Sequence, residues 1–225
     1  ALAAGRRCMA QRDGIVAGGM PIGTPAFERA YAYEVLAGHE RAHQQLEEVR
    51  DTQAAYLVLR YCLAQRFPYL LGGIGAVMAA VDADGDSPLL RHDRRQRRSL
   101  AFVLTDPLPG QEERITAAAA GVPELAWLQA QMPARDGGLQ LPGAALRWAA
   151  AHLAGALRCL PFLQLHAGAY CLDGVPLADA ASPLPYYQGL RAAAAHLQSQ
   201  AARPAFPLDL ASLLSGSPRS LRVGH

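Results

Sequence analysis

Residues 87–104 read Ser-Pro-Leu-Leu-Arg-His-Asp-Arg-Arg-Gln-Arg-Arg-Ser-Leu-Ala-Phe-Val-Leu. The stretch begins as helices commonly begin. A serine side chain can accept a hydrogen bond from a free backbone amide, and a proline in the first helical position loses no backbone hydrogen bond. The proline-containing segment after residue 105 ends the pattern. The sequence therefore predicts a helix from Ser87 to Leu104.

The same start signal recurs at Thr24-Pro25, where it predicts a helix that continues to about Arg50. Apolar spacing and turn residues predict further helices over 52–65, 69–80, 111–120, 124–131, 143–157 and 185–202. Residues 12–23 are instead rich in glycine around short β-formers, which predicts a short strand or hairpin. The expected fold is mainly α, a helical bundle with a short β element at the N-terminus.

The chain of 225 residues is 51% hydrophobic, enough for one core or for two small helical units. We expect three sections: a strand segment over 1–23, a helical bundle over 24–160, and a C-terminal helical section over 161–225. The tail from Arg203 onward is expected to be loosely ordered.

The composition limits the kinds of partner. The net charge of +2 is too small to indicate a nucleic-acid or membrane partner by itself, and no apolar run reaches membrane-spanning length. The four cysteines form no Cys-x-x-Cys pair, which favours free thiols and an intracellular location, cytoplasmic or nuclear. All 21 basic residues are arginine, so any phosphate contact must come from guanidinium groups.

One basic segment stands out within the predicted helix over 87–104. Four arginines would lie on one helix face over about 10 Å of helical rise: Arg91, Arg94, Arg95 and Arg98. With Arg97 they are the candidate nucleic-acid-binding residues, since such a stripe suits a run of phosphates. The segment fits equally a solvated helix face whose arginines pair with Asp93 and nearby carboxylates.

Four aspartates around this helix match positions of a calcium-loop template: Asp82, Asp84, Asp86 and Asp93. Ser87 stands where the template needs glycine, and Pro88 follows it. An acidic turn in front of a helix N-terminus explains the same residues without a metal ion. We therefore expect no calcium site.

The segment His39-Glu40-Arg41-Ala42-His43 matches the H-E-x-x-H pattern of zinc hydrolases. In that reading His39 and His43 would bind zinc, Glu40 would act as the base, and Glu47 or Glu48 could supply a third ligand. Such short motifs also arise by chance in helices that carry glutamate and histidine. A zinc hydrolase is a minor alternative, and the main expectation includes no metal and no cofactor.

Several short motifs occur in a fixed order between residues 14 and 157. They are Gly14-Ile15, Gly19-Met20-Pro21-Ile22-Gly23, Asp51-Thr52-Gln53, Leu59-Arg60-Tyr61-Cys62, Arg66-Phe67-Pro68-Tyr69-Leu70-Leu71, Asp93, and the segment 129–141 before the alanine-rich residues 149–153. In order and spacing this series resembles the region that follows the polymerase palm in reverse transcriptases of non-LTR retrotransposons.

The resemblance implies a role for each section. Residues 1–23 would be the palm edge, with Gly19, Met20, Pro21, Ile22 and Gly23 in the primer-grip strand, and residues 24–160 would be the thumb. The function it implies is to hold an RNA/DNA template–primer duplex by its backbone, with the arginines on phosphates.

The catalytic step of such a polymerase needs palm aspartates that hold two metal ions, and no Asp-Asp pair occurs in this sequence. The chain is therefore expected not to be an enzyme. The competing hypothesis is a non-catalytic helical scaffold derived from a retroelement. It would bind a protein partner through apolar helices such as the one that contains Ala144 to Leu157.

Overall fold

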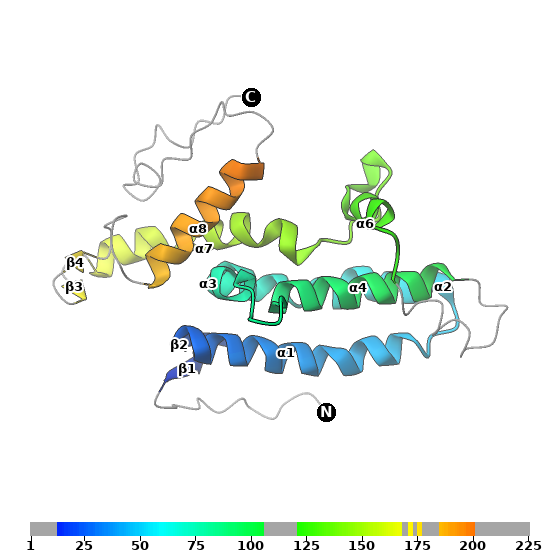
Figure 1. Ribbon diagram of the computed structural model, residues 1–225, viewed down its shortest axis with the longest axis horizontal. Coiled ribbons are helices and arrows are strands. Elements are labelled where there is room, and N and C mark those ends of the chain that lie inside the picture. Colours follow the sequence, from blue (N-terminus) through cyan, green and yellow to red (C-terminus); the bar gives the residue numbers. More distant parts are fainter. Residues whose placement is uncertain (1–12, 106–120, 168–170, 173–174, 177–184, 201–225) are drawn as a thin grey trace. The chain divides into compact units, whose positions relative to one another are not determined.

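The computed structural model describes residues 13–105, 121–167, 171–172, 175–176 and 185–200 (Figure 1). The helices are α1 (Pro25–Leu46), α2 (Thr52–Val58), α3 (Pro68–Ala79), α4 (Pro88–Leu104), α6 (Glu124–Gln131), α7 (Ala144–Ala167) and α8 (Pro185–Gln200), with a π-helix η1 (Leu59–Leu63) and a 3-10 turn η2 (Ala134–Asp136). The strands are β1 (Gly14–Ala17), β2 (Met20–Gly23), β3 (Cys171–Leu172) and β4 (Val175–Pro176). The predicted mainly α fold is confirmed. The helix expected at 111–120 and the tail from 203 lie outside the described residues, and no described helix is both long and apolar enough to cross a bilayer.

The helix starts follow the local signals. The Ser87 hydroxyl accepts from the Leu90 amide at 3.2 Å, and the Thr24 hydroxyl accepts from the Phe27 amide at 3.3 Å. Asp51 caps α2 in the same way. Each of these side chains satisfies an amide that has no partner within its helix, which explains why the starts could be placed from sequence.

The N-terminal β element is a hairpin in which β1 and β2 pair antiparallel, with Ala17 opposite Met20. Gly18 and Gly19 form the two-residue turn with φ of +58° and +82°, a conformation that favours glycine. Two tyrosine hydroxyls hold this turn: Tyr69 donates to the Gly18 carbonyl at 2.6 Å and Tyr31 to the Gly19 carbonyl at 3.1 Å. The hairpin is therefore fixed against α1 and the start of α3.

Three features differ from the expected elements. The helix predicted over 52–65 ends as α2 at Val58 and continues as the π-helix η1. The helix predicted to end at Leu157 continues to Ala167 and includes Pro161, because an internal proline removes one helical hydrogen bond without ending every helix. The pair of short strands β3 and β4 was not predicted.

The chain divides into two compact units. The first unit contains residues 1–70 and 78–147, and the second contains residues 71–77 and 148–225. The last division falls within α7, between Arg147 and Trp148.

The first unit has a continuous apolar core between α1, α2, η1, α4 and α6. Its largest buried side chains include Leu46, Leu59, Leu100, Phe102, Trp127 and Leu141. The apolar C-terminal half of α4 supplies several of them, while the arginine-rich first half lies along α1. One helix thus serves both the core and a charged surface.

Asp93 is a buried residue of α4 whose carboxylate caps α7. Its two oxygens accept from the backbone amides of Ala144 at 2.7 Å and Ala145 at 3.0 Å. Burial raises the pKa of Asp93 to about 6, although the two amides act to lower it. The carboxylate therefore fixes the start of α7 within the first unit.

We expect Asp93→Ala to lower the free energy of unfolding by about 1–3 kcal/mol, because two amides at a buried helix end lose their acceptors. Urea unfolding followed by circular dichroism would measure it. Asp84→Ala is the matched control, because Asp84 is exposed and accepts from only the Asp86 amide at 3.4 Å. Equal losses in the two variants would contradict the capping role.

In the second unit, glycines let helical backbones approach closely. A Cβ atom on Gly155 of α7 would lie 2.2 Å from the Gly72 carbonyl oxygen of α3, and one on Gly189 of α8 would lie 2.9 Å from the Ala76 Cβ. These separations are shorter than packed atoms tolerate. Gly75 of α3 has a similar role, since a Cβ there would lie 3.2 Å from the His152 Cβ.

Gly155→Ala should therefore destabilise the protein by about 1–3 kcal/mol, the usual cost of forcing extra volume into a packed contact. Gly38→Ala is the matched control, since a Cβ at Gly38 of α1 would have no atom within 4 Å. That change should stabilise by about 0.5–1 kcal/mol, because alanine favours helix over glycine. Melting temperatures that shift in the same direction would contradict the close approach.

Candidate nucleic-acid interface

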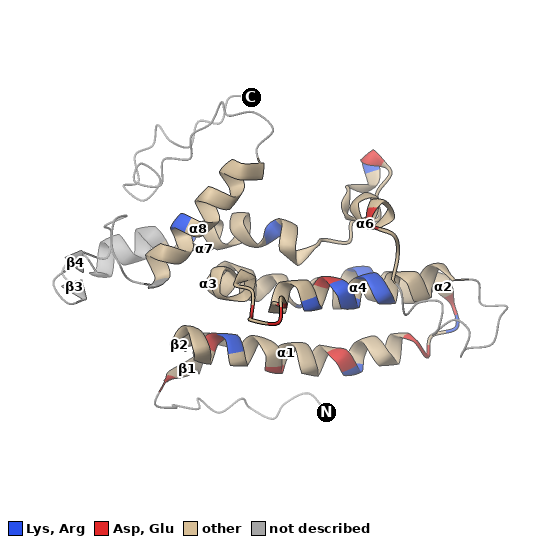
Figure 2. Ribbon diagram, viewed as in Figure 1, with Lys and Arg blue, Asp and Glu red and all other residues tan. Residues whose placement is uncertain are grey.

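The five predicted arginines lie together in the middle of α4, between Arg91 and Arg98, where Figure 2 shows basic residues gathered. Their side chains differ in exposure. Arg94 is 63% exposed, Arg91 54% and Arg98 41%, whereas Arg97 is 26% and Arg95 only 11% exposed. Three of the five therefore face outward and two are largely buried.

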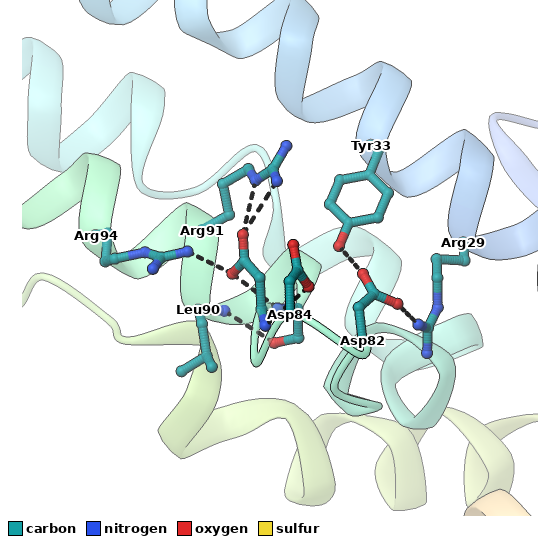
Figure 3. A network of polar contacts seen from close by, with 9 residues as sticks. Arg29, Tyr33, Asp82, Asp84, Leu90, Arg91 and Arg94 are labelled. Atoms are coloured by element: carbon teal, nitrogen blue, oxygen red, sulfur yellow. Dashed lines mark hydrogen bonds and ion pairs between the residues drawn. The ribbon is translucent and has the colours of Figure 1, made fainter.

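Arg91 and Arg94 share the Asp86 carboxylate in the acidic turn before α4 (Figure 3). Arg91 donates to Asp86 through two nitrogens, at 3.0 and 3.2 Å. Partial burial acts to raise the pKa of Asp86, but the Ser87 amide and the two guanidinium groups outweigh it and the pKa is lowered. Asp86 is therefore ionised and fixes the start of the arginine stripe.

The buried Arg95 side chain joins α4 to α1. Its Nη1 donates to Glu47 at 2.9 Å, and its Nε lies 3.0 Å from a Glu40 oxygen. Glu47 is also 3.9 Å from the Nε of Arg98. Glu40 lies in α1 and Glu47 lies at its C-terminal end, so ion pairs join α4 to α1 at these two positions.

Arg97 points to the other side of α4. It donates to Glu124 at 2.7 Å and to the Val122 carbonyl at 2.8 Å. Arg97 thereby links α4 to the segment that leads into α6. Each of the five arginines has a carboxylate within 4 Å, but Asp93, which was expected to be one of these partners, caps α7 instead.

The aspartates of the calcium-loop template separate instead of converging. Asp82 contacts Arg29 and Tyr33 of α1, as Figure 3 shows, while Asp86 turns to α4 and Asp93 is buried against α7. In the part of the chain that the structure describes, no three His, Cys, Asp or Glu side chains are arranged to hold a metal ion.

The residues of the zinc-hydrolase motif have other partners. The Nδ1 of His43 lies 2.8 Å from the Ser99 hydroxyl, and Glu40 lies against Arg95. His39 is edge-on to the Phe67 ring, with 6.3 Å between ring centroids. The donor set required for zinc is not assembled among the described residues.

A groove of about 480 Å³ runs along the arginine face. It is lined by Arg91, Arg94, Arg95, Arg97 and Arg98, together with Glu40 and Gly121. The structure thus brings all five candidate arginines to one hollow. The primer-grip-like residues Gly19, Met20, Pro21, Ile22 and Gly23 do not line it; they form the turn and second strand of the hairpin, with Pro21 buried and Ile22 55% exposed.

A second, smaller cavity of about 200 Å³ adjoins the groove, since Glu40, Arg91 and Arg95 line both. Three histidines also line the smaller cavity: His39, His43 and His92. The sequence singled out the first two only as zinc ligands and gave no role to His92. No local signal marks His92, because its position depends on how α4 packs on α1.

The two buried histidines of this cavity are uncharged. Burial lowers the pKa of His43 to about 3, with a further contribution from the Arg95 charge. Burial likewise lowers the pKa of His92 to about 3, and its ring stacks on Phe67 with 4.3 Å between centroids. These two histidines therefore add no charge to the cavity, and Arg91, Arg95 and Glu40 stand at the side it shares with the groove.

Comparison of the chain with protein-family models, with curated proteins and with solved structures gives no match.

The lowered pKa values predict acid sensitivity. Because the folded state binds a proton on His43 and His92 only near pH 3, stability is complete above the ordinary pKa of 6.5 and is lost as the pH falls toward 3. Each histidine contributes a slope of up to about 1.4 kcal/mol per pH unit. Asp93 acts in the opposite direction, since its raised pKa costs stability as the pH rises from 3.8 through about 6.

We expect His43→Gln to reduce the loss of stability between pH 7 and 5, measured by urea unfolding at each pH. His39→Gln, four residues earlier on α1 and partly exposed, is the matched control and should keep most of the wild-type slope. A wild-type slope in His43→Gln would contradict the neutral buried histidine.

Proposed function

We propose that the first unit binds nucleic acid by its phosphate backbone through the arginine face of α4. In this proposal the chain is the template–primer holding region of a reverse transcriptase-like protein and has no polymerase site of its own. The hairpin residues 19–23 would be its primer-grip strand, and the helices that follow would be its thumb.

One observation carries the proposal: five arginines and a single carboxylate line one hollow of about 480 Å³, and three of these arginines, Arg91, Arg94 and Arg98, are exposed. A guanidinium group can donate two parallel hydrogen bonds to one phosphate and stays charged at every physiological pH. A row of such groups along a helix suits the repeated, sequence-independent phosphates of a backbone.

The carboxylate partners do not prevent this use. The five arginines share four carboxylates, namely Asp86, Glu40, Glu47 and Glu124. An exposed ion pair stabilises by only about 0–1 kcal/mol, so an exposed arginine can turn from a carboxylate to a phosphate at little cost. Arg94 and Arg98 meet this condition, whereas Arg95 is buried between two glutamates and serves to position the helix.

A second candidate function is the helical scaffold that binds a protein. It is favoured by α6, where Leu125 is 79%, Leu128 50% and the following Met132 42% exposed. Their spacing places them on one side of the helix. A partner held by this apolar side would bind with little dependence on salt, whereas phosphate contacts weaken steeply as salt rises.

The decisive measurement is binding to an RNA–DNA hybrid duplex by fluorescence anisotropy over a salt series. The wild-type chain should bind with an affinity that falls steeply with salt. Arg94→Ala with Arg98→Ala should weaken binding at least tenfold at low salt and reduce the slope of log K against log salt by about 2, since each lost phosphate contact removes roughly 0.9.

Arg41→Ala with Arg135→Ala is the matched control. It makes the same change in net charge at two exposed arginines that do not line the groove. An equal loss in this control would mean that net charge, and not the groove, attracts the duplex. Absence of binding by the wild-type chain at low salt would exclude the nucleic-acid function and leave the scaffold.

A further inference from the structure

We propose that the small cavity beside the arginine groove receives the base of an unpaired nucleotide, whose phosphate lies beside the exposed Arg91 at the wall that the two hollows share. This inference rests on the proposed function, because the groove is the feature that would bring a nucleic-acid backbone to the cavity. It adds a preferred substrate: a strand with an unpaired nucleotide, such as the end of a duplex with an overhang.

The size of the cavity limits the ligand to one ring system. Its volume of about 200 Å³ is below the roughly 300–1,000 Å³ of pockets that enclose drug-sized ligands. A single nucleobase is therefore a better match than a whole nucleotide. The sugar and phosphate would remain outside, on the groove.

The walls suit a neutral aromatic group. Leu36 and Ala37 supply an apolar side, while the unprotonated rings of His43 and His92 supply polar atoms without charge. A bare phosphate would lose its hydration against these walls, and the two cations that line the cavity, Arg91 and Arg95, lie on the side shared with the groove. A base presents flat apolar faces and a polar edge, which is the combination that these walls match.

The polar edge of the base would contact ring nitrogens of His43 and His92. His43 uses its Nδ1 toward Ser99, and His92 has its Nε2 2.8 Å from the side-chain amide nitrogen of Gln96. The proposal assigns the second ring nitrogen of each to the ligand. Two fixed imidazole nitrogens would match donors and acceptors on a Watson–Crick edge, which a paired base keeps for its partner.

The cations stand where the phosphate of the same nucleotide would be. Arg91 and Arg95 line both hollows, so a group that spans from one to the other passes them. Arg91 is held by Asp86 and by its position 4.7 Å over the Tyr33 ring, and Arg95 is held by two glutamates. Glu40 also lines both hollows, so the shared wall holds two guanidinium groups and one carboxylate, and this surplus of positive charge suits an anion at the rim.

The test is a calorimetric titration of the full chain with each of the four nucleoside 5′-monophosphates, beside ribose 5-phosphate and inorganic phosphate. At least one mononucleotide should bind tenfold or more tightly than ribose 5-phosphate. Ala37→Trp should abolish that preference, because Ala37 is exposed at the cavity wall and a large ring there would occupy it without disturbing the core.

The matched variant is Arg94→Ala with Arg98→Ala, whose residues line the groove but not the cavity. It should keep the mononucleotide affinity while it loses duplex affinity. Conversely, the Ala37→Trp variant should bind a blunt hybrid duplex as tightly as the wild type does. Unchanged duplex binding would also show that the variant is correctly folded. The variant should lose the additional affinity that a single-stranded overhang gives the wild-type chain.

The inference is overturned if mononucleotides bind no more tightly than ribose 5-phosphate, or if the Ala37→Trp variant keeps the wild-type preference. In either case, binding of the blunt duplex would still support the proposed function. Failure of the wild-type chain to bind the blunt duplex would instead refute the proposed function itself. The two failures are thus distinguished by separate ligands.

Discussion

The contact between Arg95 and the glutamates of α1 determines how the rest of the first unit is arranged. The Arg95 side chain is 11% exposed, and so is that of Glu47, its partner at 2.9 Å. Removal of one member of a buried ion pair costs about 3–5 kcal/mol, because the other charge stays in a poorly solvated position. The pair therefore fixes the rotation of α4 about its axis. With Arg95 turned toward α1, helical geometry turns Arg94 and Arg98 outward and Arg97 toward α6.

The same rotation decides what lies between α1 and α4. His92, Gln96 and Ser99 lie on the side of α4 that is buried, and His43 of α1 meets Ser99. The interface is therefore polar along this stretch and becomes apolar toward Leu100 and Phe102, where the main core begins. Buried polar groups contribute little net stability but penalise every register in which they lose their partners. The polar stretch thus specifies the alignment of the two helices, and the apolar core supplies most of the stability.

The parts of this arrangement that were predictable from sequence depend on neighbouring residues. Ser87, Thr24 and Asp51 cap amides three residues away, so the starts of α4, α1 and α2 could be placed closely, and Gly18-Gly19 marked the hairpin. Asp93 could not be interpreted in this way. Its function is to cap a helix that begins 51 positions later, and nothing near it indicates that partner. The cavity was missed for the same reason, since it exists only where two separate helices meet.

The motifs behind the resemblance to reverse transcriptases mostly have structural roles in this chain. In the segment 129–141, Gly137 adopts a φ of +78°, and a Cβ on Gly138 would lie 2.0 Å from the Met132 carbonyl oxygen. The segment then returns so that the amides of Leu139 and Leu141 donate to the Ala130 carbonyl, and Leu141 is fully buried. Gly137 and Gly138 serve this turn and Leu141 serves the core, so these residues have a structural reason that does not depend on a ligand. The arginines of the groove belong to none of these motifs. The case for nucleic-acid binding therefore depends on the placement of charge on α4, and the motifs bear chiefly on the fold that presents it.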